Sequence, residues 1–417
     1  MIRVRIAPSP TGFAHVGTAY TALFNYAFAG KNKGKFIIRL EDTDVKRNIA
    51  EAEKAIYDGL LWLGLNWDEG PDKGGSFGPY KQSEKLKGYL SVAEDLVKKG
   101  FAYKDEGAIR FKNPQEDVGW EDLVRGKIDY LGDQITDFVI IKSDGYPTYN
   151  FAVVVDDIYM KITHVIRGED HISNTPRQLA LYKALNATQP FFAHHVTLRG
   201  ADRRKLSKRR DPVDLRIFRE QGYLPGAFVN YLCNLGWSHP EGKEIFDLKE
   251  FVNLFDIRRL RKAGPIFDID KLDWLNGEYI RKTPNSQLKT QIYDFFAGKY
   301  PKEKIETILP LIKDRIKTLK EFESIAGFFF EVDKQSLALR AKKLFGASHK
   351  VHLAAALDAL EKGISLDKVP KKEGFKVGDF FMDLRVAVSG TKITPPINES
   401  IEILGKEETI RRIRSVL

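Results

Sequence analysis

The first sixty residues combine short apolar runs with longer stretches of helical periodicity. Residues 2–7 alternate between apolar and basic side chains and are followed by two prolines and a glycine, which predicts a strand that ends in a loop. Apolar and aromatic residues recur at helical spacing over 16–29, and a second helix is predicted over 49–63. Between them, residues 35–40 form another run of strand length. This order of strand, helix and strand predicts a βαβ unit and a parallel sheet.

The middle of the chain interrupts this pattern and then returns to it. Beyond residue 100 the sequence contains short strands such as 108–111 and 138–142, separated by turn residues, which indicates an inserted antiparallel subdomain. An apolar run at 162–166 and a helical pattern over 175–185 follow. The α/β fold is therefore predicted to be split by the insertion.

The last third of the chain is predicted to be helical throughout. After about residue 282 apolar residues recur at helical spacing, without a fixed-period repeat. The clearest apolar face is predicted to hold Ile305, Ile308, Leu309, Ile312, Ile316 and Leu319.

The length and composition of the chain limit the number of domains, the metal sites and the cellular compartment that can be expected. A chain of 417 residues exceeds what one hydrophobic core usually serves, so two or more domains are expected. The single cysteine, Cys233, excludes an intramolecular disulfide, and one cysteine with eight dispersed histidines predicts no zinc site. No signal peptide or membrane-length apolar run is evident, which predicts a soluble protein of the reducing cytoplasm. Cys233 is expected to be a core residue.

The formal net charge of +10 suits a polyanionic partner, because lysines and arginines placed against phosphates release counterions. Nucleic acid leads the candidates on this ground. Many basic proteins bind no nucleic acid, however, so the motifs must decide.

Two short motifs suggest phosphate chemistry. His15 to Thr18 (HVGT) lies where the first loop enters its helix, a place where backbone amides and the helix dipole favour phosphate. Lys205 to Arg209 (KLSKR) begins 190 residues later and places two lysines three residues apart, so that they can bracket a triphosphate. Taken singly, the first is an ordinary loop or cap and the second a solvated charge run.

Taken together, the two motifs resemble the paired HIGH and KMSKS signatures of class I aminoacyl-tRNA synthetases. His15 and Gly17 keep the first signature, whereas Thr18 stands where the second histidine usually lies. Leu206 and Arg209 vary the second signature conservatively. Thr18 can still donate a hydrogen bond, so a reduced or rearranged phosphate contact is expected rather than an inactive site.

Longer segments extend the resemblance over nearly the whole chain and make it more specific. The sequence is similar to bacterial-type glutamyl-tRNA synthetases. The segments that carry the similarity are 5–12 (RIAPSPTG), 39–44 (RLEDTD), 146–157 (YPTYNFAVVVDD), 165–171 (VIRGEDH) and 271–281 (KLDWLNGEYIR).

The resemblance implies a fold with four parts. It implies an α/β, split Rossmann-like parallel-sheet catalytic domain, an inserted acceptor-binding subdomain that is short here, a stem-contact region with the KLSKR motif, and an all-α helical anticodon-binding region. The inserted subdomain is short because only residues 104–108 stand where many relatives carry a longer segment. The expected limits are 1–79 with 150–190 for the catalytic domain, then 80–149, 191–282 and 283–417 for the other parts.

The resemblance also implies the site residues. Glutamate is expected to be held by residues that match Arg5, Ser9, Glu41, Tyr149 and Arg167. ATP is expected to contact Ala7, His15, Gly17, Glu169, Leu206 and Lys208. The charge that develops during reaction is expected to be stabilised by His15, Thr18, Lys205 and Lys208.

Two of the glutamate contacts have a physical rationale. A forked guanidinium binds a carboxylate with two hydrogen bonds, so Arg5 is the candidate for the side-chain carboxylate, and Glu41 can pair with the α-ammonium. Without the resemblance, Glu41 would be interpreted as an exposed acid in a turn. Asp170, beside Glu169, suits a structural salt bridge equally well.

The reaction implied is ATP-dependent attachment of L-glutamate to the 3′ end of tRNA(Glu) through a glutamyl-adenylate, with Mg²⁺ accompanying ATP, no zinc and no other metal site. A monomer is expected, and charging of tRNA(Gln) is left open. Two alternatives remain. One is a nucleotidyltransferase of the same fold that acts on a small molecule, and the other is a non-catalytic tRNA-binding relative, for which Thr18 is the best argument.

Overall fold

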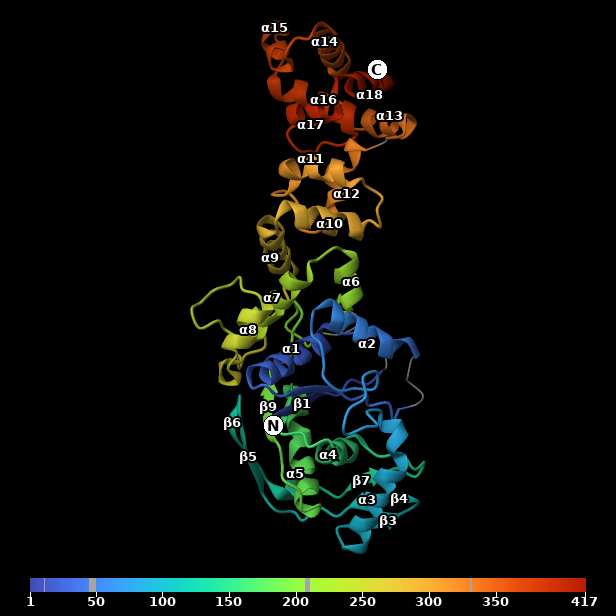
Figure 1. Cartoon of the computed structure of the whole chain (residues 1–417), viewed down its shortest axis with the longest axis vertical. Helices are drawn as coiled ribbons and strands as arrows, with labels where there is room; N and C mark the ends of the chain where they lie inside the picture. Colours follow the sequence, from blue (N-terminus) through green and yellow to red (C-terminus); the bar gives the residue numbers. More distant parts are fainter. Residues whose placement is uncertain (11, 45–49, 207–210, 331) are drawn as a thin grey trace. The chain divides into compact units, whose positions relative to one another are not determined.

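The computed structural model describes two compact units (Figure 1). The first consists of residues 1–219 and 225–272, and the second of 220–224 and 273–417. The described residues are 1–10, 12–44, 50–206, 211–330 and 332–417. Lys208, expected to contact ATP, and Arg209 therefore lie outside the described residues.

The first unit is built on parallel strands. β1 pairs in parallel with β2, and β8 pairs in parallel with β9. β1 begins beside β8, where the amide of Thr163 donates to the carbonyl oxygen of Arg3 at 3.0 Å. The strands of this unit are β1 (Arg3–Ile6), β2 (Lys35–Ile38), β3 (Ala102–Asp105), β4 (Ala108–Phe111), β5 (Val118–Asp122), β6 (Gly126–Tyr130), β7 (Phe138–Ile141), β8 (His164–Gly168) and β9 (Phe191–His195).

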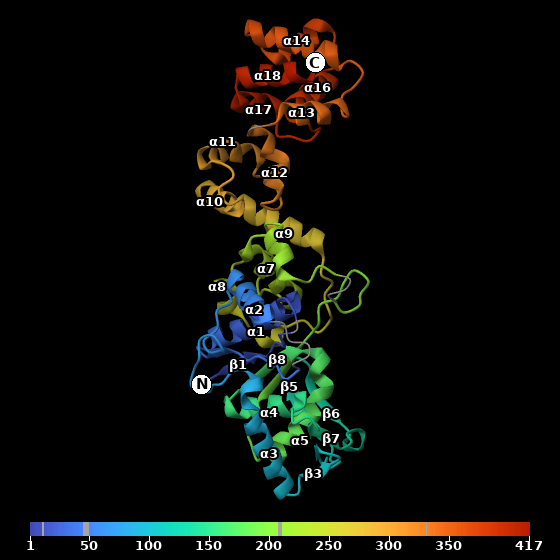
Figure 2. The ribbon, with the colours of Figure 1, turned by 90° about the vertical axis from the view of Figure 1, so that its right-hand side faces the viewer.

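Helices cover both faces of these strands. α1 and α2 lie on one side of β1 and β8, and α4 and α5 lie on the other; the views in Figures 1 and 2 both show this arrangement. The helices of this unit are α1 (Val16–Lys31), α2 (Ala50–Trp62), α3 (Leu86–Lys98), α4 (Tyr149–Tyr159), α5 (Thr175–Ala184), α6 (Leu215–Glu220), α7 (Pro225–Gly236) and α8 (Leu248–Leu254). The predicted parallel-sheet α/β fold is confirmed.

The segment 80–149 is less separate than the sequence pattern suggests. β3, β4 and β7 form a three-stranded antiparallel sheet of their own, but β5 joins β9 in parallel and carries β6 at its outer edge. One buried apolar cluster also includes Phe111 of this segment together with Phe151 and Leu181 of the flanking helices. The segment therefore shares the core of the first unit.

Within its described residues the second unit contains helices and no strand. Its own apolar core includes Leu353, Phe380, Leu384 and Ile413. The helices from residue 269 onward are α9 (Ile269–Lys282), α10 (Asn285–Phe295), α11 (Lys302–Ile312), α12 (Glu321–Ala326), α13 (Lys334–Lys342), α14 (His349–Lys362), α15 (Val369–Glu373), α16 (Val377–Ser389), α17 (Ile397–Leu404) and α18 (Lys406–Val416).

One predicted helical face differs in detail. All six of its apolar residues are buried, but α11 ends at Ile312, so Ile316 and Leu319 do not belong to that helix. α11 contains Pro310 within its last turn, where proline removes a backbone donor and disfavours continuation. The prediction of one continuous face over 305–319 was therefore wrong.

Cys233 lies in α7 and is fully buried, as predicted for a core residue. Burial raises the pKa of its thiol, which keeps the group protonated. Across the described part of the chain, none of the helices combines the length and apolarity that a bilayer crossing requires.

Candidate active site

A cavity of about 650 Å³ opens at the carboxyl ends of β1 and β8, beside the start of α1. Ligands of open α/β sheets commonly bind at this edge. It brings together most of the residues singled out in the sequence. The predicted site residues that line it are Arg5, Ala7, Ser9, His15, Gly17, Thr18, Glu41, Tyr149, Arg167, Lys205 and Leu206.

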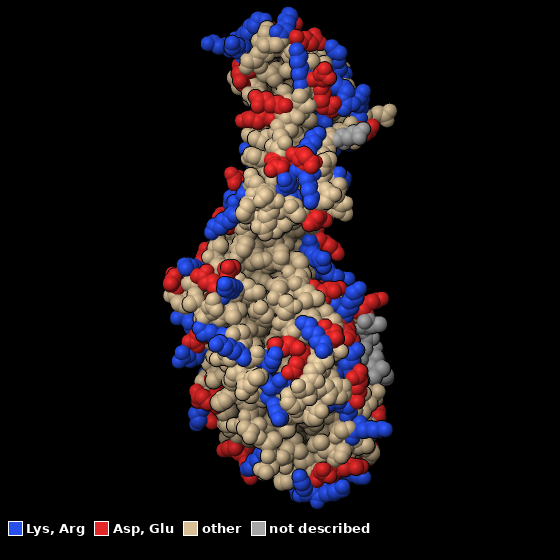
Figure 3. All heavy atoms as spheres, viewed as in Figure 1, with Lys and Arg blue, Asp and Glu red and all other residues tan. Residues whose placement is uncertain are grey.

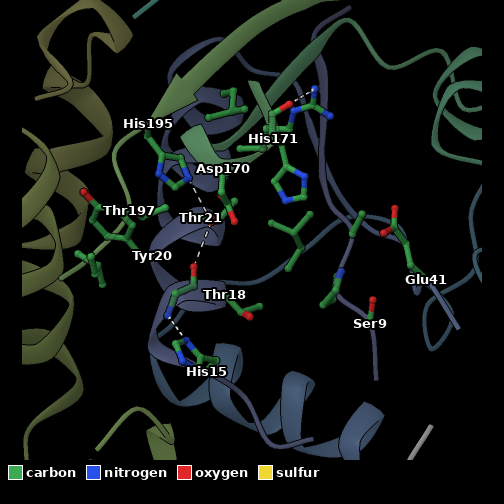
Figure 4. Close-up of a pocket in the computed structure, with 18 of the residues that line it drawn as sticks. Ser9, His15, Thr18, Tyr20, Thr21, Glu41, Asp170, His171, His195 and Thr197 are labelled. Carbon is green, nitrogen blue, oxygen red and sulfur yellow. Dashed lines mark hydrogen bonds between the residues drawn. The ribbon is translucent and has the colours of Figure 1, made fainter. Parts of the chain in front are cut away.

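The walls of the cavity come from segments far apart in the sequence. Glu41 and Ser9 lie on one side, and His195 and Thr197 lie on the other (Figure 4). α1 is fixed against β8 by Asn25, whose side-chain amide donates to the carbonyl oxygen of Ile166 at 3.0 Å. The cavity is therefore held between regular elements rather than between loops alone.

A buried network of charges forms the floor around Arg5. Its Nε and Nη2 donate to the carboxylate of Asp157 at 3.1 and 3.2 Å. Arg39 donates to the same carboxylate at 2.6 Å, and these two guanidiniums keep the pKa of Asp157 low despite its burial. Since a guanidinium has five N–H groups, Arg5 retains its Nη1 side for a second carboxylate.

Glu41 is the least compensated acid at the cavity. Its nearest described cation is Arg39, whose Nη2 lies 3.5 Å from Oε1. Burial raises the pKa of Glu41 to about 7, and the partial attraction of Arg39 and Arg5 does not cancel that effect. A ligand ammonium would restore the balance of charge and favour the ionised carboxylate.

Arg167 is held from two sides and keeps one end for a ligand. Its Nε donates to Nε2 of His194 at 3.1 Å, and its Nη2 donates to Oγ1 of Thr175 at 2.8 Å. Within the described part of the chain, its Nη1 is buried and has no hydrogen-bond partner. Because an unpaired buried donor is costly, this atom is suited to an anionic group of a ligand.

Tyr149 and His171 form a neutral polar wall. The Tyr149 hydroxyl lies 3.1 Å from Nδ1 of His171. Burial, together with the nearby charge of Arg167, lowers the pKa of His171 to about 4. His171 is therefore uncharged near neutral pH and does not add to the positive charge of the cavity.

His15 caps α1. Its Nδ1 accepts the amide hydrogen of Gly17 at 2.8 Å, so the proton of the neutral ring lies on Nε2. A Cβ at Gly17 would lie 3.0 Å from that Nδ1, which explains why glycine suits the position. The amides of Val16, Thr18 and Ala19 donate to the carbonyl oxygens of Val213 and His15, so the backbone contribution expected from the sequence is already used within the protein. The start of α1 therefore brings the positive end of the helix dipole and the His15 ring to the cavity.

The described residues of the KLSKR motif reach the cavity. Lys205 Nζ lies 2.5 Å from Oδ2 of Asp170, and Leu206 is buried. Glu169 is absent from the described cavity lining, whereas its neighbours Gly168 and Asp170 line the cavity. Its carboxylate accepts hydrogen bonds from Arg125 and from the amide of Thr197.

Several residues that line the cavity or contact its lining residues were not singled out in the sequence. Asp157 and His171 fall within the segments YPTYNFAVVVDD and VIRGEDH, so a search for charged partners inside those segments would have found them. His195 offers no such signal; burial lowers its pKa to about 4, and its Nε2 lies 3.1 Å from Oγ1 of Thr21. Across the described residues, no group of three or more potential metal ligands is assembled.

Two family models match the chain. Residues 1–108 and 105–274 match the family described as tRNA synthetases class I (E and Q), catalytic domain. Residues 287–417 match the family described as anticodon binding domain.

Known relatives match the chain over nearly the whole length of both sequences. The chain is 38% identical to glutamate–tRNA ligase 2 of Caldicellulosiruptor saccharolyticus, over 99% of the chain and 98% of the relative. It is 39% identical to glutamate–tRNA ligase 1 of Pseudothermotoga lettingae, over 100% of both. The crystal structure of a glutamate tRNA ligase from Elizabethkingia meningosepticum in complex with its amino acid has a TM-score of 0.83 at 31% identity, covering 100% of this chain and 99% of that one. The chain therefore belongs to the glutamate–tRNA ligase family of class I tRNA synthetases.

Proposed function

We propose that the protein activates L-glutamate with ATP and transfers it to the 3′ end of tRNA(Glu). The observation that carries this proposal is the charge arrangement of one cavity, where Arg5 and Arg167 can each meet a carboxylate and Glu41 can meet an ammonium. Glutamate carries these three groups. The family of the chain supports the same substrate.

In the proposed binding mode, Arg5 and Tyr149 contact the side-chain carboxylate, and Glu41 with Ser9 contacts the α-ammonium. Arg167 takes the α-carboxylate, which would satisfy its buried Nη1. Glutamine presents an amide NH₂ group where glutamate presents a carboxylate oxygen. Its donors would face the Arg5 guanidinium, so the site disfavours glutamine without a separate editing step.

For activation, the glutamate α-carboxylate attacks the α-phosphate of ATP and pyrophosphate leaves. His15, Gly17 and Thr18 would contact ATP phosphates at the start of α1, with Ala7 and Leu206 beside the nucleotide. Lys205 would stabilise the departing pyrophosphate, with Lys208 assigned the same role from the sequence. Mg²⁺ is proposed to enter with ATP. Glu169 is kept as a weaker ATP candidate because it already binds Arg125.

The remaining assignments belong to the same proposal. Residues 80–149 would bind the acceptor end of tRNA, 191–282 its stem and 283–417 its anticodon, and the match of 287–417 to an anticodon-binding family supports the last. Basic and acidic side chains are interspersed over the face shown in Figure 3. The choice of tRNA as partner is supported by the family. A cytoplasmic monomer is proposed, and tRNA(Gln) is a second candidate substrate.

The test is ATP–pyrophosphate exchange with and without tRNA, together with charging of tRNA by labelled glutamate. Glutamate-dependent exchange and charging are expected, with glutamine inactive in both assays. Exchange and charging that both fail would favour a non-catalytic tRNA-binding protein. Nucleotidyl transfer to a small molecule without any need for tRNA would favour the nucleotidyltransferase alternative.

A further inference from the structure

Arg167 is held in place by a chain of buried hydrogen bonds that begins outside the cavity. His194 of β9 and Asp122 of β5 are absent from the described cavity lining. Nδ1 of His194 lies 2.6 Å from Oδ2 of Asp122, and both side chains are fully buried. Nε2 of the same ring accepts the Nε hydrogen of Arg167 at 3.1 Å.

These contacts require one protonation state. Burial lowers the pKa of His194 more than its contact with Asp122 raises it, so the ring is neutral. Hydrogen bonds from His194 and the backbone keep the pKa of Asp122 low despite its burial, so the carboxylate is ionised. A carboxylate can only accept, which places the ring hydrogen on Nδ1 and leaves the Nε2 lone pair for Arg167.

We infer that Asp122 and His194 are positioning residues for Arg167: Asp122 selects the His194 tautomer that can accept from Arg167, and this fixes the guanidinium for the substrate carboxylate. The inference rests on the proposed function. It also gives β5 a part in amino-acid binding, although β5 belongs to the segment assigned to the tRNA acceptor end.

The surroundings of Asp122 make Asp122→Asn a sharp test. Oδ1 of Asp122 accepts backbone hydrogens from Val124 and Arg125 at 3.0 Å and from His194 at 3.2 Å. An asparagine must therefore keep its oxygen there and turn its NH₂ toward Nδ1 of His194. The ring would then carry its hydrogen on Nε2, facing the N–H of Arg167. A carboxylate-to-amide change beside a histidine disables the catalytic triad of serine proteases through the same reversal of tautomer.

The experiment measures steady-state exchange with tRNA and ATP at saturation and glutamate varied, alongside calorimetric binding of glutamate. Asp122→Asn is expected to raise the glutamate KM about 10- to 100-fold, as for loss of a hydrogen bond to a charged group, while kcat and the ATP KM stay near wild type. Glu69→Gln is the matched control. Glu69 is a buried carboxylate that accepts two hydrogen bonds from Arg3, and it is not among the residues lining the cavity.

A second pair of variants covers the case in which Asp122→Asn does not fold. His194→Gln keeps an oxygen that can accept from Arg167, whereas His194→Leu removes the acceptor. The glutamate KM is expected to rise less in His194→Gln than in His194→Leu. Where Asp122→Asn does fold, adding it to His194→Leu should change the KM little further, because both residues act through one contact.

The outcomes separate two failures. A wild-type protein that shows no glutamate-dependent exchange and no glutamate binding would defeat the proposed function and this inference with it. If the wild type is active, an unchanged glutamate KM in Asp122→Asn overturns the inference alone. Equal KM values for His194→Gln and His194→Leu, or a KM rise in Glu69→Gln equal to that in Asp122→Asn, would overturn it as well.

Discussion

At the scale of single residues, two buried arginines share one carboxylate beside the cavity, and one acid of the cavity is poorly compensated. Arg5 and Arg39 share Asp157, whereas Glu41 has one described cation at 3.5 Å. Removing a guanidinium from such a network leaves a buried carboxylate without its partner, which lowers the stability of the fold. A loss of activity in such a variant does not distinguish misfolding from weaker glutamate binding. Substitutions that keep the charge are therefore more informative.

Arg5→Lys keeps the positive charge beside Asp157 but loses the planar fork. We expect the glutamate KM to rise at least about tenfold, because an ammonium cannot bind two carboxylates in the paired geometry of a guanidinium. The ATP KM and the melting temperature should change little. Steady-state exchange kinetics and thermal denaturation check this, and an unaltered glutamate KM would remove Arg5 from the proposed contacts.

Glu41 should make glutamate binding depend on pH near neutrality. Its pKa is raised to about 7, so below that pH the free protein carries a neutral Glu41 that cannot pair with an ammonium. The affinity for glutamate should therefore fall as the pH drops from 8 to 6. Calorimetric titrations across this range measure the effect. In Glu41→Gln the affinity should be lower and nearly constant over the same range, and a slope equal to that of the wild type would assign the dependence to another group.

The individual contacts could be predicted only in part. Arg5, Glu41 and Arg167 could be singled out as candidates from the sequence because they fall in segments that resemble a known family. The pairing of Arg5 with Asp157 joins residues 152 positions apart, and periodicity carries no information at that range. The tautomer of His194 likewise depends on a carboxylate from a strand 72 residues earlier.

At the scale of elements, the start of α1 combines two tasks in one side chain. Nδ1 of His15 caps the helix, and the N–H of its Nε2 is proposed to meet a phosphate of ATP. A substitution that separates the two tasks can tell a structural residue from one that contacts ATP.

His15→Asn keeps an oxygen that can accept the amide hydrogen of Gly17, whereas His15→Ala keeps neither function. Helix caps contribute about 1 kcal/mol, so the alanine variant should be less stable by that amount and the asparagine variant should not be. Both should lose exchange activity by at least about tenfold, as for loss of one oriented donor to developing charge. Urea denaturation and single-turnover activation measure the two effects. An asparagine variant with full activity would restrict His15 to capping.

Regular elements with strong periodicity were predicted well. The helix expected over 16–29 is α1 (Val16–Lys31), and the strands expected at 108–111 and 138–142 are β4 and β7. The hydrophobic pattern did not predict which strands pair where contacts between distant segments decide the pairing. β5 and β6 could form their own small sheet by local criteria, yet β5 joins β9 through the single register pair Asp122 and Phe192. No local pattern encodes that choice.

At the scale of the whole molecule, the two units have separate apolar cores. The cluster with Phe111 and Phe151 belongs to the first unit, and the cluster with Leu353 and Phe380 belongs to the second. Segments with their own cores commonly fold alone. The proposed division of labour between amino-acid activation and anticodon recognition can therefore be tested by separating them.

Truncation after Lys282 keeps α9 whole and removes the later helices. The remaining protein should fold and bind glutamate, because the cavity lies entirely in the first unit. Its affinity for tRNA should fall, and it should no longer distinguish tRNAs with altered anticodons, since remote contacts supply part of the binding energy. Filter binding and charging kinetics check this. Unchanged anticodon preference in a folded truncation would assign the helices of 283–417 another role.

The burial of Cys233 has a practical consequence for experiments on intact protein. The sequence has one cysteine, and its thiol is fully buried with a raised pKa, so it should react slowly with maleimides. Cysteines introduced at the exposed positions Lys99 and Lys371 would then be the two sites that take fluorophores, without prior removal of the native thiol. Energy transfer between such dyes, recorded with and without tRNA, would report directly whether substrate binding changes the distance between the two units.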